Sequence, residues 1–268
     1  MKNRILSIFL FSAALVLLES CATVPLTGRK QFVAIPSSQM LSLSADSYTQ
    51  VLESNRLSTN QYYVKTVREV GKKLTAAVEA YLKLNNLQSA IEGYDWQYNV
   101  IVSEELNAWC MPGGQIAFYE GIMPVCADEA GIAVVMGHEI AHAVAQHGNE
   151  RMSQELAIQM GGMALSEALS QQKQETYELA MLAFGVGSQV GVQLPFSRTH
   201  ETEADELGLY FMAMAGYDPQ VAPAFWERMN AKSGSRPPEF LSTHPDPSNR
   251  IAHLKEMMPK AMEYYQAR

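Results

Sequence analysis

The sequence predicts an α+β fold that is mostly helical and contains a small β-sheet of three or four strands. Several long stretches carry apolar residues at helical spacing. Two regions are typical of strands: residues 94–103, where apolar and polar residues alternate, and residues 107–119, where strands flank a Gly-Gly pair. With 268 residues, the chain is long enough for one large core and short for two. We therefore expect one main domain over residues 37–268.

Helices are expected on both sides of these strands. They cover residues 37–55, 60–86, 128–147, 150–170, 175–192 and 197–215. The stretch 179–197 contains no charged residue, which makes it the internal candidate for a membrane span. Its glycines, its glutamines and Pro195 favour a buried helix instead.

The N-terminal residues resemble a bacterial export segment. In residues 1–20, two basic residues precede an apolar run, which is typical of a signal peptide. The following Leu-Glu-Ser-Cys resembles a lipobox, although Glu19 departs from the usual small or apolar residue. We expect cleavage before Cys21 and lipidation of Cys21, with residues 21–36 as a tether. Simple secretion and an uncleaved anchor are the alternatives.

The residue after the cysteine bears on location. Ala22 favours the outer membrane over inner-membrane retention, so we expect a lipid-anchored protein of the bacterial cell envelope that faces the periplasm. The net charge of −8, without basic clusters, makes nucleic acid a poor partner. In an oxidising compartment Cys110 and Cys126 could form a disulfide, and the sequence leaves their pairing open.

The expected helix over residues 128–147 contains a His-Glu-x-x-His run at residues 138–142. A spacing of four places His138 and His142 on one face, where both imidazoles can hold a zinc ion. Glu139 is rotated by about 100° from His138, so it flanks the metal and can deprotonate the attacking water. The run therefore predicts zinc-dependent hydrolysis.

A catalytic zinc ion needs a third protein ligand. Glu201 and Asp205 are the best candidates, because they lie four residues apart on the helix that opens near Ser197. Glu201 could bind the metal while Asp205 accepts a hydrogen bond from a zinc-bound histidine. A charged, solvated helix face is the alternative. His200 and Glu203 are expected to face solvent or to be structural.

Several motifs together resemble zinc metallopeptidases related to the CAAX prenyl endopeptidase and HtpX. Besides the His-Glu-x-x-His run, they are Pro25-Leu26-Thr27-Gly28-Arg29-Lys30-Gln31, Asn107-Ala108-Trp109-Cys110-Met111-Pro112-Gly113-Gly114, Ser197-Arg198-Thr199-His200-Glu201-Thr202-Glu203-Ala204-Asp205, and Thr243-His244-Pro245 with Arg250. The first is similar to the opening of secreted bacterial members. The motifs span residues 25–250, which is nearly the whole expected mature chain.

This resemblance implies a zincin-like domain of the gluzincin type with one Zn²⁺ ion per chain. The implied zinc ligands are His138, His142 and Glu201, with Glu139 as general base. Asp205 is implied to accept a hydrogen bond from a zinc-bound histidine. The implied substrate-binding residues are Asn107, Ala108, Trp109, Cys110 and Met111, on a strand edge along which a peptide lies. An exposed edge can pair an extended peptide, whereas an ordinary hairpin is the alternative.

The resemblance also places His244 and Arg250 beside the metal. Either could stabilise the developing oxyanion. His244 could instead occupy the open zinc position and keep the protease latent, because imidazole is a good zinc ligand and the loop is bounded by a proline. A purely structural histidine is the third possibility. His147, one turn past His142, is expected to cap its helix.

These features predict a zinc-dependent endopeptidase that hydrolyses unfolded or misfolded envelope proteins, in protein quality control. Residues 171–175 and 231–239 are expected to be loops that gate access. The alternative is an envelope chaperone or assembly factor with a latent protease site. Glu139 favours the enzyme, because a pure binding protein has no chemical need for a general base.

Overall fold

The computed structural model describes residues 21–232, 238–244 and 249–266, and the predicted mostly helical α+β fold is confirmed there. The strands are β1 (Cys21–Thr23), β2 (Lys30–Phe32), β3 (Gln97–Ile101), β4 (Ala108–Met111) and β5 (Gln115–Tyr119). The helices are α2 (Ser37–Ser54), α3 (Gln61–Leu84), α4 (Met123–Cys126), α5 (Glu129–Val144), α6 (His147–Ala168), α7 (Gln174–Ser188), α8 (Leu194–Met214), α9 (Ala222–Ala231), α10 (Glu239–Thr243) and α11 (Arg250–Gln266). The short turns are η1 (Gln88–Ile91), η2 (Glu120–Ile122), η3 (Gln189–Gln193) and η4 (Pro219–Val221). The expected signal peptide lies outside the described residues.

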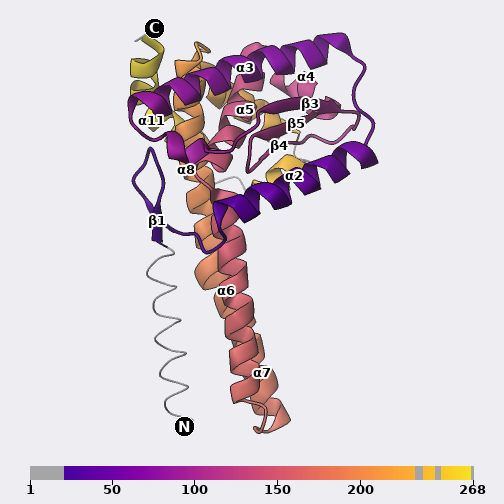
Figure 1. The fold of residues 1–268 in the computed structure, drawn as a ribbon, viewed down its shortest axis with the longest axis vertical. Coiled ribbons are helices and arrows are strands. Elements are labelled where there is room, and N and C mark those ends of the chain that lie inside the picture. Colours follow the sequence, from indigo (N-terminus) through magenta and orange to yellow (C-terminus); the bar gives the residue numbers. More distant parts are fainter. Residues whose placement is uncertain (1–20, 233–237, 245–248, 267–268) are drawn as a thin grey trace.

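The main sheet has three strands in the order β3-β5-β4 (Figure 1). β3 runs parallel to β5, and β4 runs antiparallel to it. Gly113 and Gly114, between β4 and β5, take φ angles of 104° and 89°, which glycine tolerates without strain. β4 is therefore an edge strand of this sheet, as the sequence predicts.

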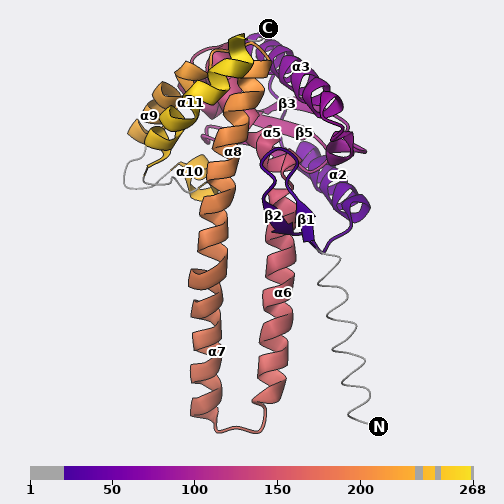
Figure 2. The ribbon, with the colours of Figure 1, turned by 90° about the vertical axis from the view of Figure 1, so that its left-hand side faces the viewer.

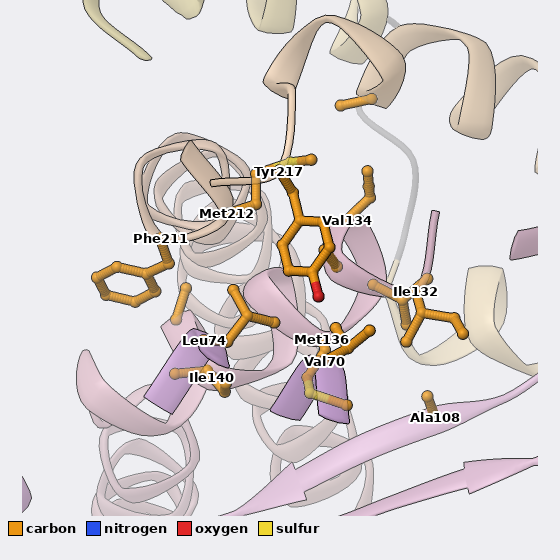
Figure 3. Close-up of a cluster of buried hydrophobic side chains, with 14 of the residues drawn as sticks. Val70, Leu74, Ala108, Ile132, Val134, Met136, Ile140, Phe211, Met212 and Tyr217 are labelled. Atoms are coloured by element: carbon orange, nitrogen blue, oxygen red, sulfur yellow. The ribbon is translucent and has the colours of Figure 1, made fainter. Parts of the chain in front are cut away.

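The core lies where α3, α5 and α8 meet (Figure 3). Its large members include Val70, Leu74, Met136, Ile140, Phe211 and Met212. α5 and α8 approach closely because Gly137 and Gly208 have no side chains. A Cβ atom on Gly208 would lie 2.9 Å from the backbone nitrogen of His138. This close packing sets the distance between functional side chains on the two helices.

α6 and α7 form a long hairpin that projects from the body of the molecule (Figure 2). A continuous helix runs from Gln174 to Met214, with a π-helical turn at η3. The prediction that a new helix opens near Ser197 is therefore wrong. Pro195 has no N–H to donate to the helix. The wider π turn lies just before it and lets the helix continue without that hydrogen bond.

The prediction of a buried helix over residues 179–197 is also wrong. None of the described side chains of α7 or η3 is buried. Among the described helices, only the one from Gln174 to Met214 is long and apolar enough to cross a membrane. The sequence of an apolar, charge-free run does not show whether protein or another apolar medium covers that run.

Residues 21–36, the expected tether, contain β1 and β2, which pair antiparallel. This small hairpin lies beside the base of α6 (Figure 2). Cys21 is the first residue of β1. Its lipidation stays a prediction.

Candidate metal centre and active site

α5 carries the two histidines of the motif on a helix that is almost entirely buried. Asp128 caps it, and its side chain accepts the N–H of Gly131 at 2.9 Å. The Nε2 atoms of His138 and His142 lie 3.1 Å apart. From α8, the two carboxylate oxygens of Glu201 each lie 3.3 Å from one of these nitrogens. The three expected ligand residues therefore meet at one point.

The donor atoms at this point fit a zinc ion. Ligand atoms of His138, His142, Glu201 and His244 all lie within 4.8 Å of one another. Imidazoles, a carboxylate and one further position are the usual surroundings of catalytic zinc. Oε1 of Glu139 is buried and has no hydrogen-bond partner among the described residues. A water at the metal position would satisfy that oxygen.

Asp205 and Arg250 hold the ligand side chains from behind. Oδ1 of Asp205 lies 3.0 Å from Nδ1 of His138, an arrangement that fixes the tautomer of a metal-binding imidazole. Arg250 donates to Asp205 and to Glu201, both at 2.8 Å, and its guanidinium lies 4.0 Å from the ring centre of Trp226. Its buried side chain does not line the cleft. Of the two candidates for the oxyanion donor, Arg250 therefore lies behind the ligands, where its geometry favours positioning Asp205 and Glu201.

His244, just after α10, reaches into the same cluster. Its Nδ1 lies 3.1 Å from Oε1 of Glu201 and 3.3 Å from Nε2 of His138. Its Nε2 lies 3.5 Å from Oε1 of Glu139, and its ring stacks on Phe240. The geometry suits both functional roles of His244, as oxyanion donor and as latch, because one ring nitrogen reaches the metal position and the other faces the general base.

The ionisable groups create a site that attracts a cation. Burial raises the pKa of Glu139, which suits a general base. Burial disfavours a charge on Glu201, yet His142 and His138 hold its pKa well below the usual value. Burial also opposes protonation of His138, but hydrogen bonds to Asp205 and Glu201 raise its pKa to about 10. The carboxylates therefore favour positive charge at His138, which a metal ion can supply, whereas burial lowers the pKa of His142 well below its usual value and favours the neutral imidazole that binds a metal.

A second buried network lies behind His142. Its Nδ1 lies 2.9 Å from Nδ1 of His147, and Nε2 of His147 lies 2.9 Å from Oε2 of Glu203. Because Nε2 of His142 faces the metal position, its Nδ1–H donates to His147, whose Nε2–H then donates to Glu203. Arg29 donates to the same carboxylate at 2.8 Å, and Thr27 also hydrogen-bonds to it.

Glu150 joins this network to the N-terminal hairpin. Arg29 and His200 each approach its carboxylate at 2.8 Å, and the rings of His147 and His200 stack at 4.3 Å. His200 and Glu203 are buried structural groups, which is one of the two predicted possibilities. The expectation that His147 caps its helix is wrong, because α5 ends at Val144 and His147 is the first residue of α6, where it contacts the ligand side chain of His142. The motif around Arg29 is the one signal that could have indicated this network.

A cleft of about 550 Å³ opens in front of the metal position. All of the expected substrate-binding residues, Asn107 to Met111, line it together with Glu139, His142 and His244. The outer edge of β4 pairs with no other described strand. Cys110 and Cys126 are both free, so no disulfide joins them.

Comparison with known proteins agrees with this geometry. The sequence model of peptidase family M48 matches residues 69–258, which include the whole metal centre. The chain belongs to peptidase family M48. The mitochondrial metalloendopeptidase OMA1 of Schizosaccharomyces pombe is 32% identical over 240 residues, which cover 89% of this chain and 66% of that protein.

Two further relatives extend the comparison. Mitochondrial metalloendopeptidase OMA1 of Homo sapiens is 28% identical over 249 residues, which cover 89% of this chain and 46% of that protein. The β-barrel assembly-enhancing protease of Escherichia coli is 29% identical over 165 residues, which cover 60% of this chain and 34% of that protein. The chain thus spans two thirds or less of the length of these three relatives.

The comparisons support the metallopeptidase domain and correct the expected location. The relatives from fission yeast, baker's yeast, Arabidopsis thaliana and cattle are all named as mitochondrial. The prediction of a lipid-anchored location at a bacterial outer membrane is therefore wrong. Basic residues, a short apolar run and one cysteine form a brief pattern, and its chemistry does not distinguish a lipobox from other targeting segments.

Proposed function

We propose that the chain is a zinc-dependent endopeptidase. The observation that carries this proposal is the meeting of ligand atoms from His138, His142 and Glu201 beside the general-base carboxylate of Glu139, in a cleft lined by a strand edge. When bound, the zinc ion polarises the scissile carbonyl and lowers the pKa of the attacking water.

The residues of the chain perform the remaining steps. An extended peptide adds to the free edge of β4 through backbone hydrogen bonds. Glu139 removes a proton from the attacking water and then delivers it to the leaving amine. Its raised pKa favours the delivery step, because the protonated carboxyl persists closer to neutral pH.

The proposed substrates are unfolded or misfolded polypeptides, and the proposed role is protein quality control. Pairing with a strand edge recognises the peptide backbone and makes few demands on side chains. A cleft that runs beside an edge strand accepts an extended segment, which folded proteins rarely expose. Selection by folding state therefore fits the site better than selection by sequence.

Hydrolysis of an unfolded protein, compared with that of a stably folded one, tests this function. Purified chain loaded with zinc should cleave unfolded casein and leave a compact, stable domain intact. Glu139→Gln should keep its zinc and lose hydrolysis by several orders of magnitude, because the ligands remain while the general base is lost. Glu167→Gln, an exposed change at the hairpin tip, is the matched control and should keep wild-type turnover. Full turnover by Glu139→Gln would refute the mechanism.

A further inference from the structure

The hairpin of α6 and α7 exposes two long rows of apolar side chains. Met152, Leu156, Met160 and Met163 recur every three or four residues on α6 and are 37–66% exposed. Leu179, Leu182, Val186, Val190 and Leu194 recur in the same way on the facing helix and are 43–69% exposed. Water is a poor environment for rows of this length.

The two rows lie on opposite outer sides of the hairpin. The helices face each other through Phe184, whose ring packs over Gly161 and Gly162, and through a 2.9 Å hydrogen bond between Ser166 and Tyr177. At 100° per residue, each exposed row lies on the side of its helix away from these contacts. The hairpin therefore exposes apolar rows on two opposite sides, whereas a helix that docks on one partner surface is apolar on one side.

The dimensions of the apolar band approach those of a lipid bilayer. The charge-free run Leu179–Ser197 is about 28 Å long at 1.5 Å per residue, and a bilayer's hydrocarbon core is about 30 Å thick. On α6, the charged residues Arg151 and Glu155 line the catalytic cleft. The outward face of α6 is then free of charge from Met152 to Ser166, which is about 22 Å. A modest mismatch of this kind is accommodated by tilt or by local thinning of the bilayer.

Charged residues flank the band at both ends. By the bounds of the helices, Glu167, Lys173, Glu175 and Glu178 lie near the turn between α6 and α7, and Arg151 and Arg198 lie toward the opposite end of the hairpin. Membrane-crossing segments place charged residues at these levels, where head groups and water solvate them. Within the band, helical hydrogen bonding already satisfies the backbone.

We propose that the α6–α7 hairpin crosses a lipid bilayer, with its charged tip on the far side and the catalytic cleft opening between the two helices at the level of the near leaflet. A protein partner or a second copy would have to cover two opposite faces, whereas lipid surrounds an inserted hairpin on all sides. Gln189 and Gln193 of η3 line the cleft, so the cleft extends along the inner side of the hairpin while the outer apolar rows face lipid. This proposal does not depend on peptidase activity.

Cysteine accessibility in the full chain tests the insertion. The chain is reconstituted into vesicles of phosphatidylcholine with a minor share of phosphatidylglycerol and treated with a membrane-impermeant maleimide. The variants are Met160→Cys and Leu182→Cys in the band, Gln172→Cys at the tip, and Tyr62→Cys as an exposed control on α3. Labelling of the wild-type cysteines is subtracted from each, and this subtraction also removes any effect of the N-terminal segment.

The comparison uses vesicle preparations in which the impermeant reagent labels Tyr62→Cys completely from outside. In these vesicles, both band cysteines should react at least about tenfold more slowly than Tyr62→Cys. Gln172→Cys should react only after the vesicles are permeabilised. Three results would overturn the proposal. They are band cysteines that react as fast as Tyr62→Cys, band cysteines that are equally protected in lipid-free buffer, and a tip cysteine that the reagent reaches from outside intact vesicles.

Discussion

His244 is the single residue whose two possible roles predict opposite changes in rate. If Nδ1 of His244 occupies the metal's open position and keeps the enzyme latent, His244→Ala should raise basal hydrolysis. If the ring donates to the oxyanion, the same change should lower kcat by about 10²–10³ while zinc is retained. Turnover of an unstructured peptide and the zinc content, measured on one preparation, separate the two. An unchanged kcat would eliminate both roles.

Glu203 should control zinc affinity through His147 without touching the metal. Glu203→Gln removes the charged acceptor at the end of the hydrogen-bond chain from His142, so zinc affinity should fall by about 10–100-fold. Competition with a chromophoric chelator measures it. Glu150→Gln is the matched control, because Glu150 also binds Arg29 but makes no hydrogen bond to His147. Equal losses of affinity in both variants would indicate a general structural effect.

The residues that spacing can reveal are the ones that the sequence predicted. His138, Glu139 and His142 share one turn of helix, and Glu201 and Asp205 lie one turn apart, so local geometry sufficed. Arg29 and Glu203 are separated by 174 positions in the chain, and no periodic pattern links them. Arg250 shows the same limit. The family resemblance placed it near the metal, but the sequence could not tell on which side of the ligands it lies.

At the scale of elements, the contact between α5 and α8 depends on Gly208. A Cβ atom there would lie 2.9 Å from the nitrogen and 3.1 Å from the Cα atom of His138, so Gly208→Ala must push the two helices apart. We expect the free energy of unfolding to fall by about 1–3 kcal/mol and zinc affinity to fall with it. Gly187→Ala is the control, because nothing lies within 4 Å of the added atom and alanine favours the helix. Urea unfolding and chelator competition measure both effects, and a fully stable Gly208→Ala would contradict them.

The attachment of the N-terminal hairpin to α6 should depend on pH through Glu150. Burial opposes its ionisation, but hydrogen bonds from His200 and Arg29 outweigh this and lower the pKa of Glu150 to about 2. A lowered pKa in the folded state gives stability that is present above the unfolded-state value and is lost as the pH falls towards 2. Protonation of Glu150 should therefore lower the free energy of unfolding by up to about 3 kcal/mol as the pH falls from 4.5 to 2. Urea unfolding across this range should decline less steeply in Glu150→Gln; an identical decline would contradict the assignment.

Elements whose apolar residues face the core were predictable, and the hairpin was not. The alternation around β3 and the helical spacing in α3 each indicate one buried side and one solvent-exposed side. Both elements lie within a few residues of the expected limits. The run 179–197 has no charged side, so its sequence could not show whether the helix is buried in the protein or exposed. Pro195 also suggested a helix boundary, whereas the adjacent π turn lets the helix continue.

For the molecule as a whole, removal of zinc should lower stability without unfolding the chain. The large core of α3, α5 and α8 forms without the metal, and Arg250 holds Glu201 and Asp205 through ion pairs that do not need it. This differs from small zinc domains, whose folding free energy comes mainly from the ion. At zinc concentrations of about one hundred times Kd, binding adds about 2.7 kcal/mol, or an increase in Tm of about 5–10 °C. Thermal unfolding with zinc and with a chelator should show this difference in the wild type and none in Glu201→Ala, which lacks a ligand. Loss of helical circular dichroism at 25 °C on chelation would instead mean that the metal holds the fold together.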